Sequence, residues 1–80
     1  MGNKTNEELN MKIGILLQRA REDKNVTQKE IAEHTGYSKN HISAVERGVC
    51  KTSVELLLGY CDVLDIEPNS VLKYKKGTIS

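Results

Sequence analysis

The stretch from Thr27 to Arg47, TQKEIAEHTGYSKNHISAVER, carries the local signals for two short helices joined by a tight turn. Thr27 followed by Glu30 is a capping box, in which each side chain hydrogen-bonds the other residue's backbone amide at the start of a helix. Gly36 stands where a left-handed residue is needed to end that helix, because glycine has no Cβ to clash. Ser38 offers the N-cap of the next helix. The stretch therefore predicts a helix on each side of a glycine turn.

Two helices joined in this way form a helix-turn-helix, whose second helix can lie in the major groove of DNA. For the two helices to pack, four small or apolar residues must face inward: Ile31, Ala32, Ile42 and Val45. The opposite face of the second helix carries amide, hydroxyl and cationic groups, on Lys39, Asn40, Ser43 and Arg47. Base edges and phosphates are bound by such groups. A generic helical hairpin can carry the same caps, so both interpretations stay open on these residues alone.

The residues before this stretch predict one longer helix. Thr5 and Glu8 form a possible capping box at its start. Asn25 is a plausible left-handed stop, so the helix should end near Lys24. Its apolar stripe recurs every three or four residues and consists of Leu9, Ile13, Leu16, Leu17 and Ala20.

The residues after the stretch predict two more helices. Gly48 closes the second helix of the pair, and Thr52 with Glu55 predicts a capping box for a fourth helix. Gly59 inside this helix should weaken it by about 1 kcal/mol relative to alanine. Pro68 suits the first position of a short fifth helix. The apolar stripe of the fourth helix consists of Val54, Leu57, Leu58, Cys61 and Leu64.

The expected fold class is therefore all-α, a compact five-helix bundle forming a single domain over residues 1–80. The second and third helices should cover about residues 28–34 and 39–47, and the fifth should end near Lys73. We expect the core over about residues 9–73, with a flexible N-terminus and C-terminal tail. At 80 residues the chain has room for one small core, and its 29% charged and 38% hydrophobic residues are typical of a folded domain.

The charge is distributed unevenly along the chain, although the net charge is only +1. Residues 12–29 hold five cations against two acids, whereas residues 53–67 hold four acids and no cation. One side of the molecule can thus be basic and orient it on a polyanion. The alternative is that these charges are simply solvated helix faces. No apolar run approaches the roughly 20 residues of a membrane span and no signal peptide opens the chain, so we expect a cytoplasmic protein without membrane contact.

The order of these helices resembles the Cro/cI-type repressors, also called the Xre family, which have a lambda-repressor-like DNA-binding domain. The resemblance covers about Ile13 to Leu72. It depends on TQKEIAEHTGYSKNHISAVERG and, after a loop, on SVELLLGYCDVLDIEP. It implies sequence-specific binding of double-stranded DNA by a transcriptional regulator, most often a repressor that acts as a homodimer on a pseudo-palindromic operator.

The resemblance also implies roles for single residues. Gln28 matches the residue that touches a phosphate and braces the recognition helix, and Arg21 with Glu46 matches a structural salt bridge. Lys39 suits guanine or phosphate and Asn40 suits adenine. His41 is left open between the DNA backbone and a capping role, and Tyr37 between a packing role and phosphate. The expected nucleic-acid-binding residues are Gln28, Tyr37, Ser38, Lys39, Asn40, His41, Ser43, Ala44, Arg47 and Lys51.

Other chemistries have little support in the sequence. His34, His41, Cys50 and Cys61 lack the paired spacing of a zinc site, so we expect no metal and no cofactor. Cys61 should belong to the core and Cys50 to a loop. No nucleophile with an evident base and no phosphate-binding glycine loop is present, so we expect neither an enzyme nor a small-molecule ligand. The main alternative to DNA binding is a protein-interaction module, such as an antitoxin-like or accessory protein on the same scaffold. It would show apolar surface on the fourth helix or the tail and no basic face on the third.

Three features depart from the family pattern, one of which is the loop from Gly48 to Thr52, which lacks the proline often found there. Thr35 stands where the family usually has an aliphatic side chain, and Gly59 replaces a usually long one.

Overall fold

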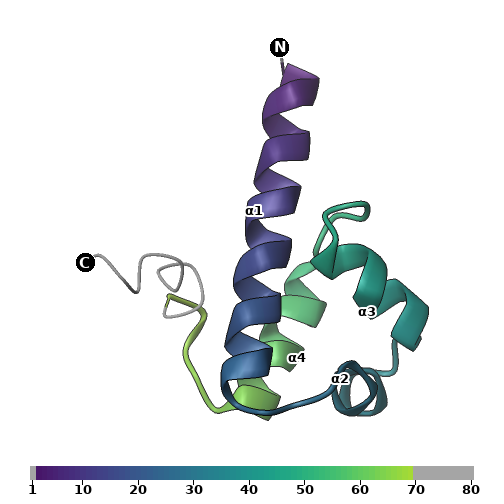
Figure 1. Cartoon of the computed structure of the whole chain (residues 1–80), viewed down its shortest axis with the longest axis vertical. Coiled ribbons are helices and arrows are strands. Elements are labelled where there is room, and N and C mark those ends of the chain that lie inside the picture. Colours follow the sequence, from purple (N-terminus) through teal and green to yellow (C-terminus); the bar gives the residue numbers. More distant parts are fainter. Residues whose placement is uncertain (1, 70–80) are drawn as a thin grey trace.

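The computed structural model describes residues 2–69, with side chains from Glu7 onward (Figure 1). These residues form four helices and no strand, which confirms the all-α prediction but not the count of five. The predicted fifth helix lies outside the described residues except for Pro68 and Asn69, whose backbone is helical. The four helices are α1 (Gly2–Asp23), α2 (Gln28–Thr35), α3 (Lys39–Glu46) and α4 (Val54–Leu64).

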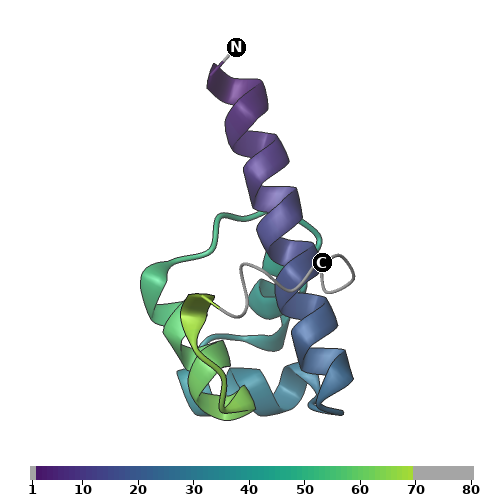
Figure 2. The same ribbon diagram turned by 90° about the vertical axis from the view of Figure 1, so that its left-hand side faces the viewer.

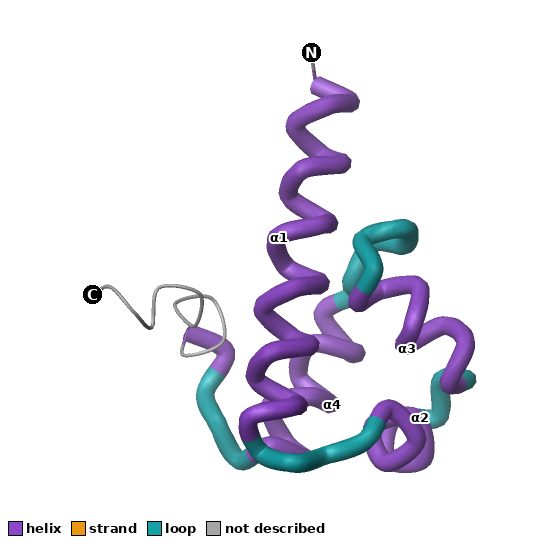
Figure 3. The backbone as a smooth tube through the Cα atoms, in the orientation of Figure 1, coloured by secondary structure: helices purple, strands orange, loops and turns teal. Residues whose placement is uncertain are grey.

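The four helices share one core. α3 packs against α1 and α2, and α4 packs against the same two helices. In Figure 1, α4 lies behind α1, and α2 and α3 stand on the right. The N-terminal turns of α1 extend beyond the other helices in both Figure 1 and Figure 2. Figure 3 shows the long loop that joins α3 to α4. α3 is therefore held on one side by α1 and α2, with its far side open.

The caps of α2 and α3 are those that the sequence predicts. Thr27 Oγ1 accepts from the Glu30 amide at 3.1 Å, and the Thr27 amide donates to Glu30 Oε1 at 2.8 Å. Gly36 ends α2 in the left-handed region, with φ of 86°. Ser38 Oγ accepts from the His41 amide at 3.1 Å and starts α3. Both helix starts and the turn between them are thus set by hydrogen bonds and dihedral angles within a few residues.

The ends of α1 agree only in part with the prediction. Asn25 has φ of 59°, so it is left-handed just after the helix, as predicted. The predicted N-cap at Thr5 is wrong, because α1 begins at Gly2 and Thr5 lies inside it. A capping box stabilises a helix start by only about 1 kcal/mol and does not stop a helix from extending further when the preceding residues permit it.

The predicted cap of α4 is also wrong, by one residue. The N-cap is Ser53, whose hydroxyl accepts from the Leu56 amide at 3.0 Å. The predicted box at Thr52 is absent, since Thr52 Oγ1 is buried without a hydrogen-bond partner among the described residues. Two adjacent hydroxyl residues offered equivalent caps, and the packing of the helix selected the second.

The core lies where the four helices meet, and the inward positions of the helix pair are confirmed. Ile31, Ile42 and Val45 are fully buried, and Ala32 packs against the same cluster. The buried apolar side chains are Leu16, Leu17, Ala20, Ile31, Ile42, Val45, Leu56, Tyr60, Cys61 and Leu64.

Three residues of the predicted stripes are exposed instead. Leu9, in the N-terminal half of α1, is 52% exposed. Val54 and Leu58 are 71% and 50% exposed, and α4 buries Leu56 and Tyr60 in their place. The sequence of α4 is apolar around most of its circumference, so periodicity alone did not decide which side faces inward.

Gly59 and Thr35, two of the departures from the family pattern, lie against each other across α2 and α4. A Cβ on Gly59 would collide with the Thr35 methyl group. Thr35 Oγ1 donates to the Ile31 carbonyl at 2.8 Å, which holds the threonine in its rotamer. The absence of a side chain at position 59 therefore makes room for the methyl group at position 35.

Replacing Gly59 by alanine should destabilise the protein, although alanine is the better helix former. The gain of about 1 kcal/mol in helix propensity is outweighed by an overpacking cost of about 2 kcal/mol at the Thr35 contact. Urea denaturation should therefore show a net loss of about 1 kcal/mol. In a Thr35→Ser background the methyl group is gone, and the same Gly59→Ala change should become stabilising. If Gly59→Ala were stabilising in both backgrounds, the close contact between position 59 and the Thr35 methyl group would be contradicted.

Candidate nucleic-acid interface

The polar face of α3, defined by Lys39, Asn40, Ser43 and Arg47, is open to solvent. Lys39, Asn40 and Arg47 are exposed and Ser43 is half-buried. The other side of the same helix buries Ile42 and Val45 completely. The capping of α3 by Ser38 places the first helical turn, with Lys39 and Asn40, at an exposed end. α3 thus presents amide, hydroxyl and cationic groups on a surface that no described residue covers.

The remaining expected contact residues surround this face. Ser38 is exposed before α3, Ala44 is half-buried on α3, and Lys51 is exposed in the loop toward α4. A shallow surface hollow is lined by Gln28 and Lys29 at the start of α2 and by Lys39 of α3, among others. The amide of Gln28 and the ammonium group of Lys29, in the first turn of α2, suit a phosphate together with the ammonium group of Lys39, in the first turn of α3, because backbone amides at a helix N-terminus also favour an anion. Lys29 was counted in the basic segment of residues 12–29 but was not among the expected contact residues, although its place beside Gln28 indicated such a role.

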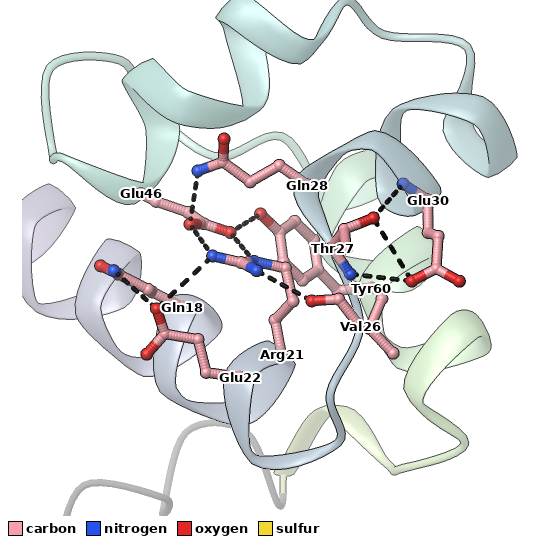
Figure 4. Close-up of polar contacts among 9 residues, drawn as sticks. All are labelled: Gln18, Arg21, Glu22, Val26, Thr27, Gln28, Glu30, Glu46 and Tyr60. Atoms are coloured by element: carbon pink, nitrogen blue, oxygen red, sulfur yellow. Dashed lines mark hydrogen bonds and ion pairs between the residues drawn. The ribbon is translucent and has the colours of Figure 1, made fainter.

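The last residue of α3, Glu46, is held from the other three helices (Figure 4). Arg21 of α1 donates to both carboxylate oxygens, from Nε at 2.8 Å and from Nη2 at 2.9 Å. Gln28 Nε2 of α2 donates to Oε1 at 3.0 Å, and Tyr60 Oη of α4 donates to Oε2 at 2.5 Å. Arg21 also donates to the Val26 carbonyl at 2.8 Å. The expected ion pair between Arg21 and Glu46 is therefore present, within a larger cluster.

Burial and hydrogen bonding act in opposite directions on the Glu46 carboxylate, which is only 3% exposed. Burial by itself raises the pKa of Glu46, but hydrogen bonds from Arg21, Tyr60 and Gln28 together outweigh it and leave the pKa below its usual value. The hydrogen bond to Glu46 raises the pKa of Arg21 against the effect of burial. Burial, reinforced by the nearby carboxylate, raises the pKa of the Tyr60 phenol. Glu46 and Arg21 thus stay charged and Tyr60 stays a donor at neutral pH.

Tyr60 was missing from the residues singled out in the sequence. Its spacing of four residues from Leu56 and from Leu64 was a signal that it belongs to the buried side of α4. Nothing in the sequence indicated a hydrogen bond to Glu46, because the partners lie 14 residues apart on different helices.

Tyr37 and His41 form a stacked pair at the start of α3. Their ring centroids are 4.9 Å apart with an interplanar angle of 21°. The Tyr37 hydroxyl lies 3.0 Å from Ser53 Oγ and donates to Glu55 Oε1 at 3.5 Å, so it connects the α3 cap to the start of α4. Both rings are half-buried. This arrangement supports a packing role for Tyr37 and holds the His41 ring beside the polar face of α3.

The four candidate metal ligands are not brought together. His34 Nε2 lies 2.7 Å from Asp62 Oδ2, and His41 stacks on Tyr37. Cys61 is in the core, as predicted, and burial raises the pKa of its thiol. Within the described part of the chain, no cluster of three or more histidine, cysteine or acidic side chains could hold a metal ion.

Comparison with known proteins identifies the family of the chain. Residues 12–71 match the family model of a helix-turn-helix domain. Two structures of the clp gene regulator ClgR from Corynebacterium glutamicum are similar to the structure of this chain. One is 36% identical with a TM-score of 0.79, covering 88% of this chain and 74% of that one. The other is 35% identical with a TM-score of 0.78, covering 90% and 94%.

A third similar structure is the restriction-modification controller protein C.AhdI from Aeromonas hydrophila. It is 31% identical with a TM-score of 0.70, covering 76% of this chain and 92% of that one. No curated protein matches the sequence closely enough to add to these. The chain belongs to the helix-turn-helix family, as a Cro/cI-type member among DNA-binding transcriptional regulators. Among residues 2–69, no helix has the length and apolarity that crossing a membrane requires.

Proposed function

We propose that this chain is a transcriptional repressor that binds one double-stranded DNA sequence as a homodimer on a pseudo-palindromic operator. The observation that carries the proposal is the construction of α3. Its polar face is exposed from Lys39 to Arg47, while its inner side and its last residue are held by three other helices. A single recognition helix reads only a few base pairs, so two copies reading half-sites about one helical turn apart supply the remaining specificity.

The residues divide into two groups by chemistry. Lys39, Asn40, Ser43 and Ala44 are the residues for base edges, with Ser38 at the first turn. Gln28, Lys29, Arg47 and Lys51 are suited to phosphates, which position the protein without reading sequence. The structure of ClgR, a gene regulator, and of C.AhdI, a controller protein, supports a role in transcription. As a regulator bound to DNA the protein would act in the cytoplasm, without catalysis and without a cofactor.

The selection of bound sequences from a random duplex pool, at about 0.15 M salt, tests this proposal. Enrichment of an inverted repeat would establish sequence-specific recognition by a dimer and supply the operator. The absence of any enriched sequence, at this and at lower salt, would contradict it.

A second candidate function is a protein-interaction module. The observation in its favour is the exposure of Val54 and Leu58 on the outer side of α4. The exposed polar face of α3 weighs against it, because a module that only grips a protein has no need of that face. If the DNA selection enriches no sequence, the outer side of α4 is the surface to test for binding of a protein partner.

Replacing Asn40 by alanine should weaken discrimination at one base position. If the amide makes a bidentate contact with adenine, the preference for that base falls by roughly 1–3 kcal/mol. Arg47→Ala is the matched control, since loss of a phosphate contact weakens binding to all sequences alike and lowers the salt dependence. Fluorescence anisotropy on the selected operator and on single-base variants measures both. Uniform weakening by Asn40→Ala would remove this residue from the base-reading group.

A further inference from the structure

We propose that Tyr60 is a positioning residue for DNA recognition, through which α4 fixes the orientation of α3. The inference rests on the proposed function, because it assigns Tyr60 a part in base discrimination. Tyr60 does not reach the polar face of α3 itself. It acts on Glu46, the last residue of α3, by donating a hydrogen bond to Oε2 at 2.5 Å.

The packing of the helices shows why this hydrogen bond matters. α3 packs mainly against α1 and α2, and α4 packs mainly against the same two helices. Tyr60 comes from the middle of α4, is fully buried, and connects α4 to α3 directly (Figure 4). Its phenol therefore ties the end of α3 to α4, which otherwise supports α3 mainly through α1 and α2 and through the Tyr37 hydroxyl beside Ser53.

The carboxylate of Glu46 is held from three directions. Arg21 binds both oxygens from α1, Gln28 binds Oε1 from α2, and Tyr60 binds Oε2 from α4. A bidentate arginine keeps the carboxylate in the plane of its guanidinium group but leaves small motions of the pair relative to the rest of the core. Donors from two further helices oppose those motions. Without the phenol, Oε2 keeps only the Arg21 Nε donor, and the end of α3 loses its hydrogen bond to α4.

A small change in the orientation of α3 is enough to affect base reading. Asn40 lies six residues before Glu46, which is about 9 Å along a helix axis. A contact that requires precise geometry, such as a bidentate hydrogen bond, tolerates displacements of only about 0.5 Å. A tilt of about 3° around Glu46 already moves Asn40 by that distance. Phosphate contacts from long, flexible lysine and arginine side chains tolerate such a shift, whereas a bidentate amide contact does not.

The test replaces Tyr60 by phenylalanine in the full chain, which keeps the ring in the core and removes only the hydroxyl. Affinity is measured for the selected operator, for operators with one base changed, and for an unrelated duplex. All measurements are made at low temperature, where circular dichroism shows each variant to be as helical as the wild type. We expect about a tenfold loss of discrimination between operator and single-base variants. Affinity for the unrelated duplex and its salt dependence should not change.

Cys61→Ala is the matched control. Cys61 is the next residue of α4 and is buried in the same core, whereas the hydrogen bond to Glu46 comes from Tyr60. Its truncation should destabilise the protein while leaving discrimination at the wild-type level. The inference is overturned if Tyr60→Phe keeps full discrimination, or if Cys61→Ala loses as much.

Failure of the proposed function gives a different result. In that case the wild-type protein itself prefers no sequence, and both proposals fall. If the wild type discriminates and Tyr60→Phe discriminates equally well, only the role of Tyr60 is wrong. A loss of affinity for all duplexes alike in Tyr60→Phe would also overturn the inference, because it would indicate general damage to the fold.

Discussion

Replacing Arg21 by methionine is expected to lower the free energy of unfolding by about 3–5 kcal/mol, because Glu46 then remains as a buried charge without its counterion. The Arg21 guanidinium supplies two of the four hydrogen bonds to that carboxylate and also binds the Val26 carbonyl. A chain of 80 residues has a total stability of roughly 4–12 kcal/mol. The variant should therefore be close to unfolding at 37 °C, which urea and thermal denaturation followed by circular dichroism will show.

The double variant Arg21→Met/Glu46→Gln is the control for this explanation. Its glutamine carries no charge, so no ion is left unpaired in the core. It should be more stable than Arg21→Met alone, even though one more residue has been changed. If the double variant were less stable than the single one, the penalty would come from lost packing around Arg21 and not from the unpaired charge.

The same change should alter the dependence of stability on pH. The pKa of Glu46 in the folded wild type lies below its usual value of 4.5. Its contribution to stability is therefore complete above about pH 4.5 and is lost as the pH falls through the lower, folded-state pKa. In Arg21→Met the hydrogen bonds and the charge of the arginine are lost while burial remains, so we expect the pKa of Glu46 to rise above that of the unfolded chain. Protonation then relieves the unpaired charge, so the stability gap between variant and wild type should narrow as the pH falls from about 7 to about 4.

Replacing Gly14 by alanine is the second change for which we expect a large effect. α1 and α3 approach each other closely here, and a Cβ on Gly14 would collide with the Val45 carbonyl oxygen and lie 2.7 Å from that of Glu46. Both atoms belong to the backbone, so no side-chain rotation can relieve the contact. The helices would have to move apart, at a cost of about 3 kcal/mol. Alanine's advantage over glycine of about 1 kcal/mol in a helix offsets this only in part.

Chemical denaturation should thus show a net loss of about 2 kcal/mol for Gly14→Ala. Lys12→Ala, on the exposed side of the same helix, is the control and should change stability by less than about 0.5 kcal/mol. Because the displaced helix is α3, operator affinity should also fall when it is measured under conditions in which the variant is folded. A variant as stable as the wild type would show that α1 and α3 do not approach each other this closely.

The local structure around α2 and α3 could be predicted from the sequence because each signal acts over a few residues. Thr27 and Glu30, which form the capping box of α2, are three residues apart. The left-handed conformation of Gly36 depends only on the absence of a Cβ at that residue. The alternation of buried and exposed positions on α3 follows from the helical period, with Ile42 and Val45 inside and Asn40 outside. The stretch that most resembles the family was therefore also the stretch predicted best.

The predictions for α4 failed where several choices were locally equivalent. Thr52 and Ser53 both offered a hydroxyl for the cap, and the helix begins after Ser53. Val54 and Leu58 are as apolar as Leu56. The side of α4 that faces inward is nevertheless the one that carries Leu56 and Tyr60. Only the position of α4 against α1 and α2 separates these alternatives. The fifth helix and the tail after it fall largely outside the described residues, so their predictions stand untested.

By itself the sequence determined the caps of α2 and α3, the glycine turn between them and the polar face of α3, since hydrogen bonds and dihedral angles between near neighbours are sufficient for each. The expectation of an ion pair between Arg21 and Glu46 came from the resemblance to a family, because those residues lie 25 positions apart. Only the tertiary structure brought Tyr60 and Gln28 to the same carboxylate and placed Thr35 over Gly59. Contacts of this kind depend on how whole helices pack, which cannot be read from the spacing of residues along the chain.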